Sequence, residues 1–154
     1  MKTKIALAAL SLFAIGAQAA DWSDTSLSYR FGNKYAEPYN TKDVSKNILN
    51  LSHVSGYKYG TNFVSVDMLN SGATDGNAQE AYVVYRHTLD LGKVTGKAYG
   101  FGPVKGLGLT AGFDWNTKND AGYSSRKRML VAGPTFFMAV PAGSVTTLRQ
   151  SYIP

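Results

Sequence analysis

The sequence predicts an all-β protein, an antiparallel meander that we expect to form a transmembrane β-barrel. Apolar and polar residues alternate along several segments, which is the period of a strand with two different faces. The composition of 10 Tyr and 16 Gly with only 17% charged residues is typical of strands joined by tight turns. A sustained 3.6-residue period is found in no segment, so we expect no amphipathic helix.

The first element that we expect is a signal peptide at residues 1–19. Lys2 and Lys4 precede an apolar run that ends at Ile15, and small residues follow up to Ala19. This order of charged, apolar and small residues is that of a cleaved secretory signal. An apolar run of about eleven residues is too short to cross a bilayer, which needs about twenty. We therefore expect export through a cleaved signal peptide, with cleavage after Ala19.

Six strands are expected in the remainder of the chain. The two-residue period is clear in several of them and less clean in residues 79–89. The last of them contains Pro134, which implies an edge strand, a bulge or a local break. The expected strands are residues 24–31, 47–55, 61–69, 79–89, 106–116 and 129–140.

The connections between these strands differ in length. Three connections are long and polar: residues 32–46, 70–78 and 117–127. The connection at residues 56–60 is short, and the one at residues 90–105 is glycine-rich and irregular. Long connections on one side and mostly tighter ones on the other are typical of outer-membrane barrels.

The fifth expected strand raises the question of which medium its apolar face meets. Leu109, Phe113 and Trp115 share one face, and Thr110 and Asp114 share the other. A soluble sandwich would pack the apolar face against a second sheet, whereas a barrel would turn it toward lipid. Period alone does not separate these alternatives. The signal peptide, the aromatic residues near strand ends and the charges on the polar faces favour the barrel.

Four blocks of the chain resemble a known family. They are WSDTSLSYRFG, SHVSGYKYGTNFVSVDML, AQEAYVVYRHTLDLGKVTG and GLTAGFDWNTKNDAGYSSRKRMLVAGPT, and they are similar to the Tsx-like outer-membrane channels, relatives of the nucleoside-specific channel-forming proteins. The resemblance runs from about Trp22 to about Pro141. It implies a barrel of about twelve strands in the cell outer membrane that carries small solutes by passive diffusion, without an enzymatic step. Nucleoside preference belongs to one branch of the family.

The resemblance also divides the chain. Six expected strands are fewer than the roughly eight of the smallest bacterial barrels, so we expect residues 20–141 to form the N-terminal half of a barrel. Residues 142–154 depart from the family, as a truncation or a frameshift would produce, and members continue well beyond this point.

The pore-lining candidates are charged and aromatic residues on the polar faces of the expected strands. Rings of charge set ionic selectivity in channels, and inward aromatic side chains can stack on a base or a sugar. The candidates are Arg30, Asp67, Glu80, Tyr82, Arg86 and Asp114.

The partners that we expect are outer-membrane lipid, lipopolysaccharide and small solutes, nucleosides among them. The basic residues 124–128, SSRKR, could pair with anionic lipopolysaccharide groups. Nucleic acid is not expected, because the formal charge of +6 is dispersed along an exported chain.

The sequence contains no residue pattern that is typical of a catalytic site or a metal site. Cysteine is absent, and His53 and His87 have no partners at metal-ligand spacing. We therefore expect no enzyme, no metal and no cofactor. Two alternative functions stay open at this point: a non-porous structural or adhesion barrel in the outer membrane, and a soluble periplasmic β-sandwich that binds a ligand.

Overall fold

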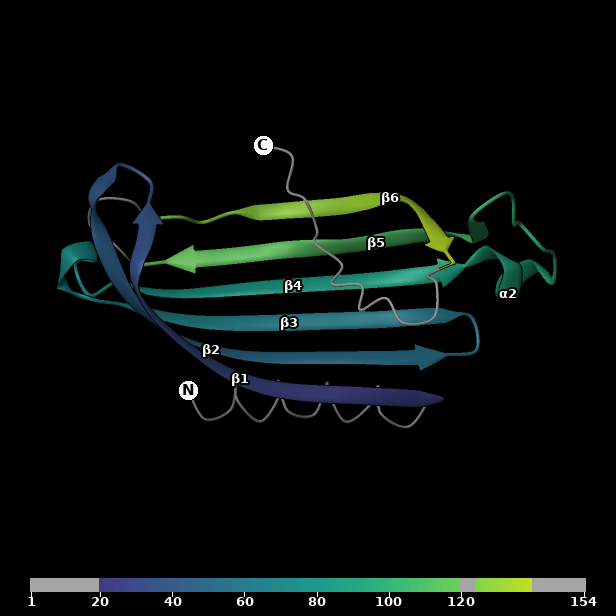
Figure 1. The fold of residues 1–154 in the computed structure, drawn as a ribbon, viewed down its shortest axis with the longest axis horizontal. Helices are drawn as coiled ribbons and strands as arrows, with labels where there is room; N and C mark the ends of the chain where they lie inside the picture. Colours follow the sequence, from purple (N-terminus) through teal and green to yellow (C-terminus); the bar gives the residue numbers. More distant parts are fainter. Residues whose placement is uncertain (1–19, 120–123, 140–154) are drawn as a thin grey trace.

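The computed structural model of this chain describes residues 20–119 and 124–139. The expected signal peptide at residues 1–19 and the divergent tail at residues 142–154 lie outside the described residues. The elements are β1 (Trp22–Glu37), β2 (Asn40–Tyr57), β3 (Gly60–Ser71), the 3-10 turn η1 (Ala73–Asp75), β4 (Gln79–Asp90), the short helix α2 (Leu91–Thr95), β5 (Val104–Lys118) and β6 (Arg128–Met138) (Figure 1).

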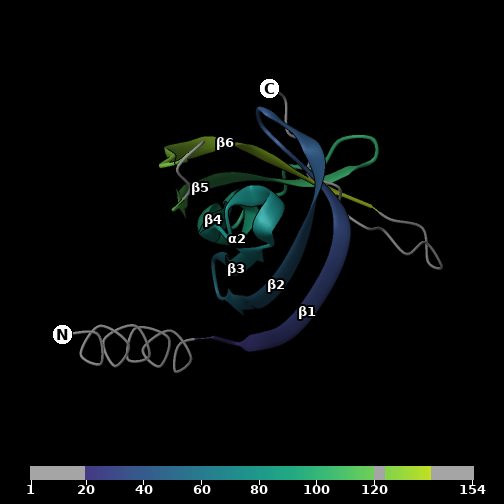
Figure 2. The ribbon, with the colours of Figure 1, turned by 90° about the vertical axis from the view of Figure 1, so that its left-hand side faces the viewer.

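The six strands form one sheet in the order β1-β2-β3-β4-β5-β6. Every neighbouring pair is antiparallel, so the predicted all-β meander is confirmed. The sheet is strongly curled but open, with β1 and β6 at its two edges (Figure 2). Pro134 lies within β6, and β6 is an edge strand of the described sheet. Of the edge strand, bulge or break that this proline predicted, the edge strand is confirmed.

The prediction of a long loop at residues 32–46 was wrong. In the structure β1 continues to Glu37 and β2 starts at Asn40, so a tight turn of Pro38 and Tyr39 joins them. Tyr39 has a φ of 62°, the left-handed conformation that such a turn needs. The polar composition concealed these strand ends, because Glu37 of β1 and Lys46 of β2 are paired with each other rather than solvated.

The connection at residues 90–105 contains the five-residue helix α2. The Asp90 side chain accepts a hydrogen bond of 3.1 Å from the backbone N–H of Lys93, which is the usual role of an N-cap. Gly96, with a φ of 70°, ends the helix. One turn of helix does not alter the fold class. Among the described residues, no helix has the length and apolar character that a membrane crossing requires.

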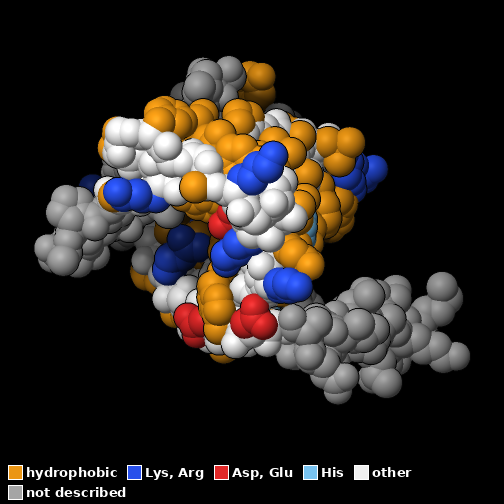
Figure 3. Space-filling view, turned by 90° about the vertical axis from the view of Figure 1, so that its right-hand side faces the viewer, with side chains coloured by type: hydrophobic (Ala, Val, Ile, Leu, Met, Phe, Trp, Pro, Cys, Tyr) orange, Lys and Arg blue, Asp and Glu red, His pale blue; other side chains and the backbone are white. Residues whose placement is uncertain are grey.

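The register assigns apolar residues to one face of the sheet. Leu27 lies opposite Leu51, and Leu51 lies opposite Val66. Val66 in turn lies opposite Val83, so an apolar row crosses four strands. This face is largely uncovered, since Leu27 is 70% exposed and Leu130 of β6 is 89% exposed. Hydrophobic side chains accordingly cover much of the outer surface in Figure 3.

The neighbouring row belongs to the other face and is polar throughout. From β1 to β5 its members are Ser28, Asn50, Asp67, Tyr82 and Asn116, each opposite the next. The β1–β2 hairpin bends over this face at one end of the sheet (Figures 1 and 2). We therefore call it the concave face, and the apolar one the convex face.

Candidate functional site

All of the pore-lining candidates lie on the concave face. The register places Arg30 and Glu80 in one row across the sheet. The residues between them in this row are Ile48 of β2 and Leu69 of β3. The other candidates lie in the next three rows of the same face, toward the β2–β3 turn, because alternate residues of a strand share a face. Figure 3, which views the molecule from the end that carries α2, shows Lys and Arg side chains in and around a hollow. The members of the candidate set on this face are Arg30, Asp67, Glu80, Tyr82, Arg86 and Asp114.

Arg30 and Asp67 form the first charged pair of this face. Arg30 Nη2 lies 2.9 Å from Asp67 Oδ1, although β2 separates their strands. Asn50 of β2 fills the gap, since its Nδ2 donates to Asp67 Oδ1 at 2.9 Å and to Ser65 Oγ at 2.9 Å. The Arg30 side chain is 55% exposed, so its guanidinium group is accessible to ions in the concave space.

Arg86 and Asp114 form the second pair, on β4 and β5. Arg86 Nη1 lies 2.6 Å from Asp114 Oδ1, and the Tyr82 hydroxyl donates to Asp114 Oδ2 at 3.2 Å. Gly112, directly opposite Arg86, makes room for this arrangement. A Cβ atom at Gly112 would lie 2.0 Å from the Tyr85 carbonyl oxygen and 3.0 Å from Arg86 Cδ.

A third group of charges lies where the β1–β2 hairpin bends over the end of the sheet, and we call it the charge cluster. Lys118 Nζ lies 2.8 Å from Glu37 Oε2 and 2.9 Å from Asp75 Oδ2. Lys46 pairs with Glu37 and lies 3.8 Å from Glu80. The side chains of Lys118 and Asp75 are only 2% and 4% exposed. The members of the charge cluster are Glu37, Lys46, Asp75, Glu80 and Lys118.

The charge cluster lies beyond the apolar part of the convex face, which ends at Phe31 in β1 and at Trp115 in β5. Burial raises the pKa of the Glu37 carboxyl, but its hydrogen bonds to Lys118 and Lys46 and their positive charges lower that pKa more, so the net shift is downward. Burial likewise lowers the pKa of Lys118, but Glu37 and Asp75 outweigh it and the net shift is upward. Both groups are therefore charged at neutral pH.

Sequence reasoning missed most of the charge cluster, because Glu37, Lys46, Asp75 and Lys118 all lay in expected loops. A signal for two of them was present. Lys46 continues the two-residue period of the polar positions in β2, and Lys118 continues that of Asp114 in β5. Extending each expected strand along its own period would have placed both lysines on the concave face.

A cavity of about 470 Å³ opens between the charge cluster and the middle of the concave face. Its wall combines three pore-lining candidates, Asp67, Glu80 and Tyr82, with apolar side chains such as Leu69 and Met129. Carboxylates, a phenol and apolar carbons therefore face the same space. Such a wall can contact both the hydroxyl groups and the ring faces of a small polar solute.

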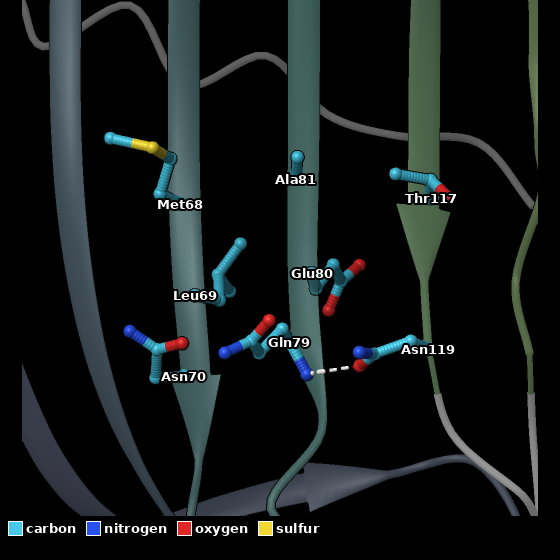
Figure 4. Close-up of a pocket in the computed structure, with 8 residues that line it drawn as sticks. All are labelled: Met68, Leu69, Asn70, Gln79, Glu80, Ala81, Thr117 and Asn119. Atoms are coloured by element: carbon cyan, nitrogen blue, oxygen red, sulfur yellow. Dashed lines mark hydrogen bonds between the residues drawn. The ribbon is translucent and has the colours of Figure 1, made fainter. Parts of the chain in front are cut away.

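A second cavity, of about 420 Å³, lies at the ends of β3, β4 and β5 (Figure 4). Asn119 accepts a hydrogen bond of 2.6 Å from the backbone N–H of Gln79 beside it, and this contact fixes the end of β5 against β4. Of the pore-lining candidates only Glu80 borders this space. It is therefore a feature of the sheet end rather than of the concave face.

Both histidines lie on the convex face. His53 Nδ1 lies 2.7 Å from Thr25 Oγ1, and His87 lies between Asn62, at 2.8 Å, and the Tyr57 hydroxyl, at 3.1 Å. Within residues 20–119 and 124–139, no three His, Cys, Asp or Glu side chains come together as a group that could hold a metal ion.

The comparisons with known proteins give no relative: no family model, no curated protein and no solved structure matches this chain.

Proposed function

We propose that this chain is part of an outer-membrane channel of the Tsx-like type, through which small solutes diffuse passively. The observation that carries this proposal is the unequal distribution of side chains between the two faces of the sheet. Paired charges and hydroxyl groups gather on the concave face, and the convex face exposes Leu27, Tyr29 and Phe31 at 64–70%. A barrel in a bilayer needs this distribution, apolar outward and polar inward.

The dimensions of the convex face suit a bilayer. In β5 the outward residues from Leu107 to Trp115 are all apolar, and eight residue steps of about 3.3 Å give a length of about 26 Å. At the usual strand tilt of about 35–45° this length covers about 19–22 Å of the apolar band of outer-membrane barrels, which is about 25 Å tall. Trp115 would then lie near the bilayer surface, where Trp is enriched.

The concave face suits an aqueous lumen for small, uncharged polar solutes. Its charges occur mainly as pairs of opposite sign, such as Arg30 with Asp67 and Arg86 with Asp114. A wall of paired charges orients water and polar groups without attracting one sign of ion over its whole length. The resemblance to the Tsx-like channels makes nucleosides the first solutes to test.

The experiment that tests this function starts with heat-modifiability. The chain is expressed with its expected signal peptide, the outer membrane is isolated, and the gel mobility of boiled and unboiled samples is compared. A mobility shift in the outer-membrane fraction, followed by conductance steps in planar bilayers that decrease when nucleosides are added, is the expected result. Recovery of a folded protein in the aqueous periplasmic fraction would overturn it.

A second candidate function is a non-porous structural or adhesion barrel, and one observation favours it. The bend of the β1–β2 hairpin and the Glu37–Lys118 pair bring β1 and β5 together over one end of the concave face, where they narrow it. The same membrane preparation separates the two candidates, since a non-porous barrel shows the mobility shift without conductance. The soluble sandwich gains no support, because the described strands form one sheet and leave the apolar face uncovered.

A further inference from the structure

Arg128, the first residue of β6, is held at the edge of the convex face. It lies opposite Trp115, and its guanidinium carbon is 4.7 Å from the centroid of the Trp115 ring, which is a cation–π contact. Its Nη1 also donates to the backbone carbonyls of Asn116 at 2.7 Å and of Lys127 at 2.8 Å. The side chain nevertheless stays exposed, and a guanidinium group has further N–H donors besides those of Nη1.

The residues just before β6 divide between the two faces of the sheet. Their pairing with β5 continues, because the backbone N–H of Lys118 donates to the Ser125 carbonyl at 2.9 Å. Alternate residues of an extended chain face opposite sides, so Arg126 shares the convex side with Arg128. Lys127 faces the concave side, where it borders the cavity of about 470 Å³. The basic run at residues 124–128 is therefore two separate features.

Both arginines lie just beyond the apolar part of the convex face. The outward residues of β6 are apolar from Leu130 to Phe136, and Trp115 is the last apolar outward residue of β5. Tryptophan rings at the edge of an apolar band lie at the level of the lipid headgroups. In a bilayer the guanidinium group of Arg128 would therefore lie beside lipid phosphates.

The convex face offers these two arginines no carboxylate within the described residues. The outward neighbours on β4 and β5 are Val83, Ala81 and Thr117, which are uncharged. The nearby carboxylate of Glu80 belongs to the concave face and lies 3.8 Å from Lys46 there. Positive charge at this edge is thus left for an anionic group from outside the described chain.

The arginines lie at the end of the sheet that suits the outer leaflet. At this end β1 runs past its last outward aromatic residue, Phe31, to Glu37, and the β1–β2 hairpin bends over the sheet (Figure 1). At the opposite end a turn of only Lys58 and Tyr59 joins β2 to β3. Outer-membrane barrels have short periplasmic turns and carry their longer extensions outside, where lipopolysaccharide is the lipid.

We propose that Arg126 and Arg128 form a binding site for the phosphate groups of lipopolysaccharide. Two successive outward positions of one strand are about 7 Å apart, so the pair suits a headgroup that carries more than one phosphate. A guanidinium group binds a phosphate through two parallel N–H···O bonds. The contact with Trp115 holds Arg128 ready for such bonds. The inference rests on the proposed function, because it takes the convex face to meet lipid.

Trp115 can report this binding, because it contacts Arg128 and is one of only two tryptophans. Trp22→Phe removes the other and gives the parent chain for the experiment. The parent chain is refolded into phosphatidylcholine vesicles that contain a rising fraction of lipopolysaccharide with an energy-acceptor dye, in EDTA and at a salt concentration of about 0.15 M. Loss of Trp115 emission gives the half-saturating fraction of lipopolysaccharide. The same titration is made with dye-labelled phosphatidylglycerol at equal phosphate content.

The variants are Arg126→Gln and Arg128→Gln, with Lys127→Gln as the matched control. Each arginine variant should raise the half-saturating fraction of lipopolysaccharide about fivefold. Lys127→Gln removes the same charge on the other face and should change that fraction by less than about twofold, because salt screens it. Arg126→Gln is the decisive variant, since Arg128 also contacts the reporter.

The outcomes separate this site from the proposed function. Heat-modifiable protein whose lipopolysaccharide titration is the same for Arg126→Gln and Lys127→Gln would overturn the site and leave the channel proposal intact. Equally tight binding of phosphatidylglycerol would overturn the assignment to lipopolysaccharide, because the arginines would then bind any lipid phosphate. A parent chain that is heat-modifiable in no vesicle would contradict the proposed function, and the site with it.

Discussion

Glu37 and Lys118 are 81 positions apart in the chain, yet their side chains form an ion pair of 2.8 Å that joins the end of the first strand to the end of the fifth. This pair constrains the bend of the β1–β2 hairpin, because the Lys118 side chain is only 2% exposed and also contacts Asp75. Three strands lie between these two ends in the sheet, so the pair fixes curvature as well as position.

Lys118→Gln should weaken the end of the sheet. It leaves the buried carboxylates of Glu37 and Asp75 without their shared cation, and breaking a buried ion pair costs about 3 kcal/mol or more. We expect a loss of that size in the free energy of unfolding, measured by urea titration of detergent-refolded protein with tryptophan fluorescence as the signal. Lys42→Gln, an exposed lysine on the same hairpin, is the control and should change the value by less than about 0.5 kcal/mol. Equal effects of the two substitutions would contradict the role of the pair.

Acid should release the hairpin before it unfolds the sheet. The pKa of Glu37 is lowered in the folded state by Lys118 and Lys46, so its stabilising contribution is fully present above the usual carboxyl pKa and is lost as pH falls through the lowered one. The pKa of Lys118 is raised, so its contribution is present below the usual lysine pKa and is lost as pH rises through the raised one. Between these limits the contribution of this pair to the stability should be constant.

The measurement for this pH dependence is the free energy of unfolding between pH 7 and pH 3, for the unmodified chain and for Glu37→Gln. The unmodified chain should lose stability toward acid more steeply than the variant. If the free energies of unfolding of the unmodified chain and of Glu37→Gln fall in parallel down to pH 3, another carboxylate controls the loss of stability in acid.

Arg30→Gln should change ionic selectivity more than stability. The Arg30 side chain is 55% exposed, so its pair with Asp67 contributes at most about 1 kcal/mol. Loss of the guanidinium group leaves the Asp67 carboxylate uncompensated, and the reversal potential in a salt gradient should move toward cation preference. Lys58→Gln, in the turn between β2 and β3, removes the same charge outside the concave face and should leave that potential unchanged. If Lys58→Gln shifted the reversal potential equally, the result would show that Arg30 does not line the lumen.

Two glycines of the concave face should respond differently to alanine. A Cβ atom at Gly112 would lie 2.0 Å from the Tyr85 carbonyl oxygen, whereas one at Gly133 would meet nothing within 4 Å. Gly112→Ala should therefore cost about 1–3 kcal/mol through overpacking, and Gly133→Ala should be neutral or stabilising by up to about 1 kcal/mol. Urea titration of both variants checks the difference, and a tolerated Gly112→Ala would show that Arg86 does not need this space.

The sequence was sufficient to predict the strands and their faces, and insufficient for the bend. Leu27, Val66 and Phe113 lie on the convex face, as their period predicts, because alternation is local and needs no knowledge of neighbours. The Glu37–Lys118 pair depends on how far the sheet curls, which no local pattern contains. Polar composition was also misleading at residues 32–46, since charges that are paired with each other can continue a strand that solvated charges would end.

The medium at the convex face can be decided with two adjacent positions in β1. Leu27 and Ser28 are both exposed in the chain, but Leu27 belongs to the convex face and Ser28 to the concave one. In water either residue should tolerate arginine within about 0.5 kcal/mol. In a bilayer Leu27→Arg should cost about 2–4 kcal/mol, whereas Ser28→Arg should cost little because it faces the wet lumen. Folding into lipid vesicles, followed by urea titration, measures both values. A small and equal cost at the two positions would mean that water covers both faces, and the barrel would then have to be abandoned for a soluble sheet.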